Sequence, residues 1–234
     1  MAIGIKDRIA TEVSIIGSGP VGLLLAILLG RQGKHVTIAD RWPDIYDRPR
    51  AVTMDAEVAR ILATLGIDVD NDYAFENHKE LYYWKNADLQ DLQIVDWESL
   101  APCGWHVTYW FNQPEFEARL TKIVETLPNV TLLRGWTAVK LHQNATGTRV
   151  TLHDTPTGNH TITLDAAFLV GADGANSFVR DSLGLKVVDK GYFFDWLILD
   201  MVPDADYRVS PAQWQLCDPK RPTTIVPGGP GRRR

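Results

Sequence analysis

Three glycines and one aspartate carry the clearest chemical signal in this sequence. Gly17, Gly19 and Gly22 follow the apolar run at residues 13–16 in the text Gly-Ser-Gly-Pro-Val-Gly. A tight turn, a close backbone approach to a phosphate and close helix packing each need a residue without a Cβ atom. Asp40 stands about 20 residues further on, where a carboxylate can bind a ribose hydroxyl. This spacing predicts a dinucleotide-binding turn.

Such a turn lies between a buried strand and a helix. Residues 13–16 suit the strand, the Leu- and Ala-rich text up to Gly30 suits the helix, and residues 35–39 suit a second strand. The helix N-terminus would offer N–H groups and the positive end of its dipole to phosphates. The alternative is a purely structural strand–helix–strand unit in which Asp40 is only solvated. The predicted contacts at this turn are Gly17, Ser18, Gly19, Pro20, Val21, Gly22, Asp40 and Arg41.

Composition indicates an ordinary globular protein. The chain has 234 residues, of which 45% are apolar and 23% charged, and its formal charge is −5. Lys and Arg are scattered except at residues 232–234, which we interpret as an exposed end, so no nucleic-acid partner is indicated. Cys103 and Cys217 are far apart and lack CxxC spacing. No disulfide framework or zinc site is therefore predicted, and a reduced, cytoplasmic setting fits.

Residues 13–30 could also suggest a signal peptide or a membrane anchor, because Lys6 and Arg8 precede them. Glycines and a proline interrupt this apolar run, and no small-residue cleavage site precedes the charges that follow it. No other stretch is apolar over the roughly 20 residues that a transmembrane helix needs. The sequence predicts a soluble protein with no membrane partner.

The rest of the chain alternates between loops, two helices and many short strands. Residues 1–11 are predicted as a loose arm and residues 41–50 as a loop. Helices are predicted at 55–65 and at 113–127, where apolar residues follow the 3.6-residue period, with Pro114 in the first turn of the second. Predicted strands cover residues 81–84, 92–95, 105–111, 130–133, 137–141, 149–153, 161–164, 167–170, 192–201, 213–216 and 223–226. The last of these have no visible partner in the sequence.

Four further motifs stand in order after the glycine turn: DRPRAVTMDAE, FNQPEFEARL, LVGADGANSFVR and CDPKRP. With them the chain resembles the FAD-dependent aromatic hydroxylases, which are single-component flavoprotein monooxygenases. Within that family it looks most like the 3-(3-hydroxyphenyl)propionate hydroxylases. The resemblance covers essentially the whole chain and depends on several ordered motifs.

The resemblance assigns roles to residues outside the glycine turn. Arg50 matches an arginine near the flavin and its pyrophosphate, and Gln113 matches a glutamine that approaches the ribityl chain. Asp40 matches the acid on the adenosine ribose, although Glu is more usual there. Arg50 could instead form a surface ion pair, and Gln113 could only start a helix.

The Asp-Gly motif of the family is matched by Asp173 and Gly174, with Ser177 and Arg180 completing it. In the family, FAD contacts and NAD(P)H-linked roles meet at this motif. Its alternatives are a simple turn dipeptide at Asp173-Gly174 and a surface ion pair at Arg180.

The resemblance implies an α/β fold: an FAD-type Rossmann-like doubly wound sheet with a β-meander, plus part of an antiparallel-sheet substrate domain. The implied FAD-binding domain covers residues 1–75 and 108–184, and a partial substrate domain covers 76–107 and 185–234. The Gly-Asp-Ala-Ala-His type motif of the family does not occur in this sequence. We therefore expect the chain to be the N-terminal part of a hydroxylase.

The implied activity is hydroxylation of a phenolic substrate such as 3-(3-hydroxyphenyl)propionate in aromatic compound catabolism. NADH or NADPH would reduce FAD, and O₂ would form a flavin C4a-hydroperoxide, because the difficult chemistry belongs to the cofactor. No catalytic side chain and no metal site are assigned, and the full-length protein could be a homodimer. Two alternatives stay open: an NAD(P)-dependent reductase in which Arg41 favours a 2′-phosphate, and a non-catalytic nucleotide-binding fragment.

Overall fold

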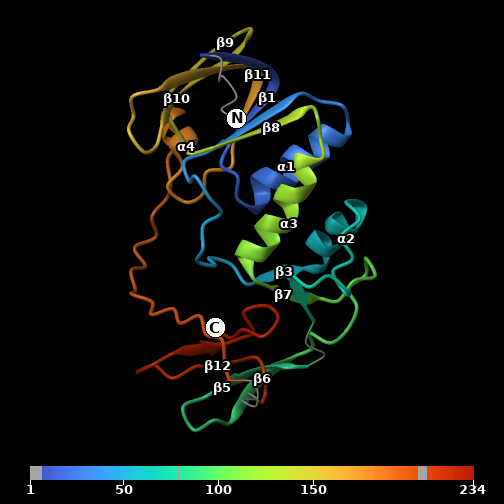
Figure 1. The fold of residues 1–234 in the computed structure, drawn as a ribbon. Coiled ribbons are helices and arrows are strands. Elements are labelled where there is room, and N and C mark those ends of the chain that lie inside the picture. The colour runs from blue at the N-terminus through green and yellow to red at the C-terminus, as the bar shows by residue number, and fades with distance from the viewer. Residues whose placement is uncertain (1–6, 78–79, 205–209) are drawn as a thin grey trace. The chain divides into compact units, whose positions relative to one another are not determined.

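The structure is a computed structural model that describes residues 7–77, 80–204 and 210–234 (Figure 1). The chain divides into two compact units. The first spans residues 1–47 and 117–193, and the second spans 48–116 and 194–234. The division into compact units does not show what either unit binds. The predicted FAD-binding and substrate domains therefore stay a prediction, with their boundaries at 75/76, 107/108 and 184/185.

The first unit is built on a six-stranded sheet with the strand order β8-β2-β1-β11-β10-β9. Neighbours among β8, β2, β1 and β11 are parallel, whereas β11, β10 and β9 are antiparallel and form a meander. This arrangement confirms the predicted α/β fold with a parallel sheet and a β-meander. The strands are β1 (Arg8–Ile16), β2 (Val36–Asp40), β8 (Val130–Arg134), β9 (Trp136–Asn144), β10 (Gly147–Asp154) and β11 (Thr161–Gly171).

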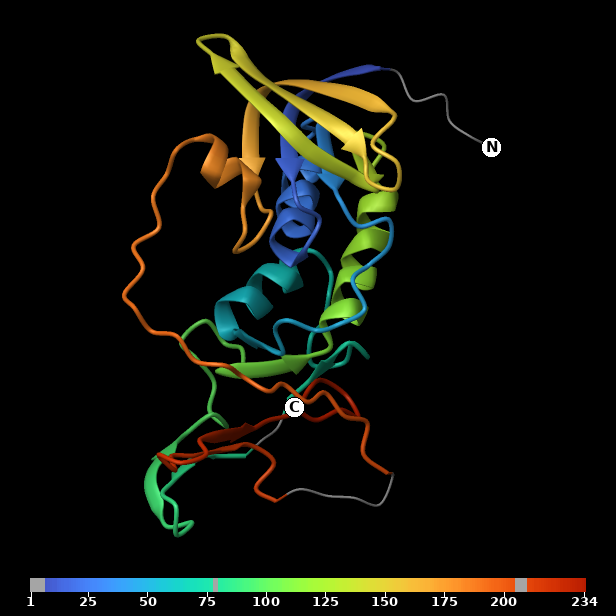
Figure 2. The same ribbon diagram turned by 90° about the vertical axis from the view of Figure 1, so that its left-hand side faces the viewer.

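Helix α1 (Pro20–Arg31) packs beside β1, β2 and β8 (Figure 2). Its Leu23 and Ile27 are fully buried, as are Ile15 and Ile38 on the strands. Gly30 keeps the helix close to the sheet, since a Cβ atom there would lie 2.5 Å from a methyl group of Val130. Helix α3 (Gln113–Glu125) contributes its residues from 117 onward to this unit, and α4 (Phe178–Ser182) follows β11.

Two details of the first unit correct the sequence-based expectations. The predicted loose arm is wrong for residues 8–11, because β1 begins at Arg8 and pairs Arg8 with Thr163 and Thr11 with Ala166. Residues 1–6 of that arm lie outside the described residues. The strands predicted at 161–164 and 167–170 are one strand, β11, because β1 provides a pairing edge along almost its whole length.

The second unit contains two small sheets, with the orders β3-β7-β4 and β13-β12-β5-β6. The late strands have partners, contrary to expectation: β12 pairs in parallel with β5, and β13 pairs antiparallel with β12. This pairing is long-range, so local sequence could not reveal it. The elements are β3 (Thr53–Asp55), α2 (Ala56–Thr64), β4 (Phe75–Glu76), β5 (Tyr82–Lys85), β6 (Asp91–Val95), β7 (Thr108–Phe111), β12 (Trp214–Leu216) and β13 (Thr223–Ile225).

Aromatic side chains form the core of the second unit. Trp97 packs on Tyr82 with ring centroids 4.3 Å apart, and its ring also lies 6.0 Å from that of Trp110. Val52 and Val226 are buried against the same cluster. Aromatic rings at these separations interact favourably beyond the area that they bury. Val226, which follows β13, is thereby packed in the same cluster as Trp110 of β7.

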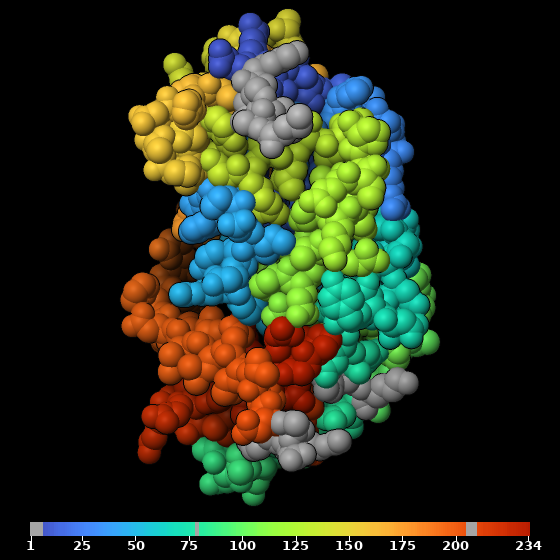
Figure 3. All heavy atoms as spheres, in the orientation of Figure 1, coloured from blue at the N-terminus to red at the C-terminus, as the bar shows by residue number. Residues whose placement is uncertain are grey.

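The strand predicted at residues 192–201 does not form. Residues 185–200 have no helix or strand assignment, and Met201 alone makes an isolated bridge, with Arg233. The side chains of Phe194, Trp196 and Leu197 are 76%, 70% and 85% exposed, within the orange surface segment of Figure 3. A segment with strand-like composition forms a strand only when another strand offers a pairing edge and one of its faces is packed.

Tyr109 should make the second unit sensitive to alkaline pH. Its hydroxyl donates to Asp70 Oδ1 at 3.0 Å and accepts the His106 N–H at 3.2 Å. Burial, aided by Asp70, raises the pKa of Tyr109 to about 12. Because the unfolded residue loses its proton near pH 10, the free energy of unfolding should fall as pH rises from about 10 to about 12. Urea unfolding across that range should show a shallower fall for Tyr109→Phe; equal slopes would contradict the assignment.

Candidate functional site

The turn after β1 has a geometry that only glycine permits at two positions. Gly17 has φ +104°, and a Cβ atom there would lie 2.3 Å from the carbonyl oxygen of Ala172. A Cβ atom on Gly22 would lie 1.9 Å from the carbonyl oxygen of Gly17. Both obstacles are backbone atoms, which cannot rotate away as a flexible side chain could. The turn is therefore tightly packed between the start of α1 and the residues after β11.

Gly19 differs from its two neighbours because a Cβ atom there would meet nothing within 4 Å. It is the N-cap of α1, no side chain caps this end, and Pro20 begins the helix. The first N–H groups of a helix have no partner within the helix and attract anions. Gly19 thus leaves open space where a phosphate group could approach the backbone.

The carboxylate of Asp40 lies against the same turn. Its Oδ2 accepts the Ser18 N–H at 2.6 Å, and its Oδ1 accepts the Trp42 N–H at 2.9 Å. The parallel register places Ala39 beside Ile16, so the ends of β1 and β2 bring the acid and the glycines together. A carboxylate has further lone pairs with which to accept a ribose hydroxyl.

Ser18 presents a buried polar atom that the protein does not satisfy. The residue is 1% exposed, and its Oγ has no hydrogen-bond partner among the described residues. A buried hydroxyl without a hydrogen-bond partner destabilises the folded protein unless a ligand provides the partner. Together with the open space at Gly19 and the uncapped start of α1, this hydroxyl fits a dinucleotide phosphate.

Ser18→Ala tests this interpretation. Without cofactor, the free energy of unfolding should be unchanged or higher by about 1 kcal/mol, because the variant removes an unsatisfied polar group. FAD binding should weaken by about tenfold if the hydroxyl completes its bonding on the cofactor. Urea unfolding and flavin fluorescence quenching measure the two effects. A loss of more than about 1 kcal/mol without cofactor would show that Oγ has a partner in the protein.

Asp173 and Ser177 form a closed local network. The Ser177 hydroxyl donates to Asp173 Oδ1 at 2.5 Å, and Asp173 Oδ2 accepts the Val179 N–H at 3.1 Å. Ser177 Oγ also accepts the Arg180 N–H as the N-cap of α4. The side chain of Arg180 pairs with Asp181 and donates to the carbonyl oxygen of Ala175. These side chains therefore hold the shape of the turn.

The Asp-Gly motif nevertheless adjoins the glycine turn through its backbone. Ala172 donates its N–H to the carbonyl oxygen of Ile16 at 2.7 Å, and the Gly17 Cβ position would be 2.8 Å from the Asp173 nitrogen. Gly174 has φ +82°, as the turn requires. The first unit thus gathers Gly17, Asp40 and Asp173 where β1, β2 and β11 end, the edge at which open α/β sheets bind ligands.

Arg41 and Val21 stand at the surface of the first unit. Val21 is 71% exposed, and the guanidinium of Arg41 lies 5.4 Å from the centroid of the Trp42 ring. This cation–π contact gives Arg41 a defined local partner. Its predicted contact with a cofactor stays a prediction.

Arg50 and Gln113 belong to the second unit, where the structure brings them together. Gln113 is 4% exposed, and its Oε1 accepts the N–H groups of Arg50 and Ala51, both at 2.9 Å. Gln113 is therefore more than the start of a helix, because its side chain fixes the loop that carries Arg50. Whether either residue contacts flavin stays a prediction.

The interpretation of residues 232–234 as an exposed end is wrong. Arg232 pairs with Glu115 at 2.8 Å, and the side chain of Arg234 is only 15% exposed and pairs with Asp200 at 2.8 Å. The sequence did not reveal the role of Arg234, because a basic triplet looks solvated when its acidic partners are far away in the chain. Asp200, one of two acids in the apolar run at residues 192–201, was the available signal.

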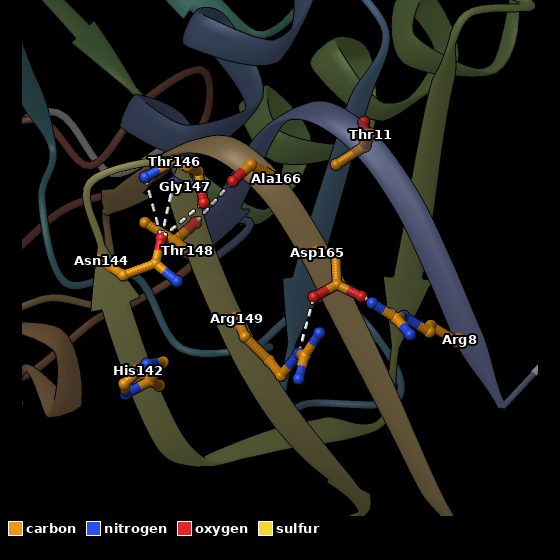
Figure 4. Close-up of a pocket in the computed structure, with 10 residues that line it drawn as sticks. All are labelled: Arg8, Thr11, His142, Asn144, Thr146, Gly147, Thr148, Arg149, Asp165 and Ala166. Atoms are coloured by element: carbon orange, nitrogen blue, oxygen red, sulfur yellow. Dashed lines mark hydrogen bonds and ion pairs between the residues drawn. The ribbon is translucent and has the colours of Figure 1, made fainter.

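A polar depression of about 440 Å³ lies on the first unit (Figure 4). Asp165 stands between Arg8 and Arg149 there, bonded to both, with Arg149 Nε at 2.7 Å. Partial burial opposes ionisation, but the two arginines together lower the pKa of Asp165 below its ordinary value. These side chains satisfy one another, and none of the predicted cofactor residues lines the depression.

The described residues contain neither a membrane-spanning helix nor a cluster of metal ligands. Neither α1 nor any other helix there combines the length and the apolar character needed to span a bilayer. No cluster of three His, Cys, Asp or Glu side chains is placed to hold a metal ion in the same part of the chain.

Comparisons with known proteins agree with this geometry. The profile of the FAD binding domain family matches residues 10–234. A protein named probable NADH-specific resorcinol 4-hydroxylase, from Rhodococcus jostii, is 34% identical over 95% of this chain and 42% of its own length. 3-(3-hydroxy-phenyl)propionate/3-hydroxycinnamic acid hydroxylase 1 of Burkholderia vietnamiensis is 32% identical over 92% of this chain and 34% of its own.

A solved structure shares the fold. The crystal structure of p-nitrophenol 4-monooxygenase from Pseudomonas putida superposes with a TM-score of 0.77 at 21% identity, over 96% of this chain and 57% of that one. The parallel sheet, the glycine turn and the acid at the end of β2 are typical of dinucleotide-binding domains. The chain belongs to the FAD binding domain family. It spans less than half the length of the curated relatives named here.

Proposed function

We propose that this chain is the FAD-binding part of a flavoprotein that hydroxylates a phenolic ring with NADH or NADPH and O₂. The observation that carries the proposal is the glycine turn, where Gly17 and Gly22 have no room for a side chain and Gly19 opens on free space. Resorcinol and 3-(3-hydroxyphenyl)propionate, which the relatives' names contain, are both phenols. A phenol is therefore the proposed substrate class.

In the first unit, the proposed role of the chain is to bind the adenine dinucleotide end of FAD. The N–H groups at the start of α1 would face the pyrophosphate, and the Ser18 hydroxyl would complete its bonding there. Asp40 would accept a ribose hydroxyl while keeping its bond to the Ser18 N–H. The backbone at Asp173 and Gly174 would close the site from β11. Ser177 and Arg180 would support that turn.

In the second unit, Arg50 is proposed to lie near the flavin and its pyrophosphate, with Gln113 approaching the ribityl chain. A guanidinium is well suited to phosphate and to electron-rich rings because it is planar and always charged. Gln113 also holds the Arg50 backbone, so the two would act together. FAD, when bound, would supply the redox and oxygen chemistry.

A reduced cytoplasmic setting is part of the proposal. Cys103 and Cys217 are both free thiols in the structure, and persistent free thiols suit a reducing compartment. A small aromatic substrate and O₂ would be the partners of the protein. A homodimer of the full-length protein is a further expectation from the resemblance.

The first experiment is a visible absorption spectrum of the purified chain, as isolated and after addition of FAD and desalting. A retained oxidised-flavin spectrum supports the proposal, and NADH and NADPH oxidation with a panel of phenols is the next assay. The same measurement on a longer chain that reaches the length of the relatives is the matched comparison. If neither chain retains flavin, the assignment of Gly17, Asp40, Gln113 and Asp173 to FAD is wrong.

A further inference from the structure

The segment 226–234, which we call the arginine hairpin, forms a closed turn in the second unit. Val226 and Arg234 exchange two backbone hydrogen bonds at 2.9 and 2.8 Å, and the Gly228 N–H bonds to the carbonyl oxygen of Arg232. Arg233 exchanges two more backbone bonds with Met201. Asp200 and Arg234, one residue away on each segment, are therefore held side by side.

The guanidinium of Arg234 bonds both to Asp200 and to the backbone of Pro49 and Arg50. Nε and Nη2 bind the two carboxylate oxygens of Asp200 at 2.8 and 3.0 Å, which is a bidentate ion pair. Nη1 donates to the carbonyl oxygen of Arg50 at 3.2 Å, and Nη2 donates to that of Pro49 at 2.5 Å. A planar fork of donors fits this arrangement, whereas a lysine ammonium cannot reproduce it.

The loop at residues 49–51 is thus held through its backbone from two directions. Gln113 accepts its N–H groups at Arg50 and Ala51, and Arg234 donates to its carbonyl groups at Pro49 and Arg50. The loop has no helix or strand bonds of its own. Two side chains distant in the sequence therefore help to hold the backbone from which the Arg50 side chain extends.

The arginine hairpin also fixes the start of α3, which carries Gln113. Gly229 has φ +94°, and a Cβ atom there would lie 2.4 Å from the Asn112 nitrogen. Arg232 pairs with Glu115 in the first turn of the helix. The hairpin consequently contacts both the Arg50 loop and α3, the helix that carries Gln113.

We infer that Arg234, oriented by Asp200, is a positioning residue that holds the Arg50 loop in the shape required to bind FAD. The inference rests on the proposed function, because that function places Arg50 near the flavin. Arg234 itself is assigned no contact with cofactor or substrate. Arg234 acts on the loop through its hydrogen bonds to the carbonyl groups of Pro49 and Arg50.

The test compares Arg234→Gln, Arg234→Lys and Asp200→Asn with the control Arg233→Gln. The control removes the same charge one residue away, where the Arg233 side chain, among the described residues, donates to the carbonyl oxygen of the neighbouring Arg232. Amide hydrogen exchange at Arg50 and Ala51 is measured without cofactor, with the Cys217 amide, which bonds to Lys85, as the internal reference. The FAD dissociation constant is then measured for whichever chain length retains flavin, and far-UV circular dichroism confirms folding.

Arg234→Gln should speed exchange at Arg50 and Ala51 by about tenfold and leave Cys217 unchanged. It should also weaken FAD binding by about tenfold, with Asp200→Asn similar, Arg234→Lys intermediate and Arg233→Gln like the unaltered chain. Unchanged exchange at Arg50 and Ala51, or faster exchange with unaltered FAD affinity, would overturn the inference. Uniformly faster exchange, including Cys217, would assign Arg234 a general structural role and also overturn it. Failure of the unaltered protein to bind FAD would instead refute the proposed function, and with it the role of Arg234 toward flavin.

Discussion

Gly22→Ala should destabilise the first unit by about 3 kcal/mol or more and abolish FAD binding. The new methyl group would lie 1.9 Å from the carbonyl oxygen of Gly17, so either α1 or the turn must move. Moving the turn would disturb the Ser18 N–H bond to Asp40 and the contact with Ala172. Urea unfolding gives the stability change, and flavin fluorescence quenching gives the binding change.

Gly19→Ala is the matched control for this prediction. Its methyl group would enter open space, and Gly19 has φ −70°, which alanine adopts easily. The free energy of unfolding should change by less than about 1 kcal/mol, because alanine replaces glycine only at an N-cap. FAD binding should nevertheless weaken, since the methyl group occupies the proposed phosphate position. Equal stability losses in Gly19→Ala and Gly22→Ala would contradict the described turn.

Gln113→Ala should destabilise the second unit by about 1–3 kcal/mol, because it leaves two backbone N–H groups without their acceptor. Those groups belong to Arg50 and Ala51, so their amide exchange should accelerate in the same variant. Flavin affinity should fall as well if Arg50 lies near FAD. Urea unfolding, amide exchange and flavin titration measure the three effects.

Gln113→Glu is the control that keeps an acceptor at this position. A carboxylate can accept both N–H groups, so exchange at Arg50 and Ala51 should stay close to that of the unaltered chain. Its negative charge should still weaken binding of an anionic cofactor if Gln113 lies near it. If Gln113→Ala leaves the Arg50 and Ala51 amides protected, the side chain does not hold the loop.

The sequence alone determined the glycine turn and most of the elements around it. The signals are local: Gly17, Gly19 and Gly22 stand at spacings typical of a strand–turn–helix unit, and Asp40 follows at the end of the next strand. Helices α1 and α3 were likewise predictable, because their apolar periods and proline positions lie within single segments. Short-range steric and periodic constraints are readable without knowing any partner.

Only the tertiary structure decided the features that depend on distant partners. Residues 192–201 have strand-like composition but no pairing edge, whereas β12 and β13 form because β5 provides one. The role of Arg234 was likewise invisible, since Asp200 and the Pro49 carbonyl are remote in the chain. A basic residue is solvated or buried according to whether folding brings an acid and a carbonyl group to it, and this is a property of the folded chain.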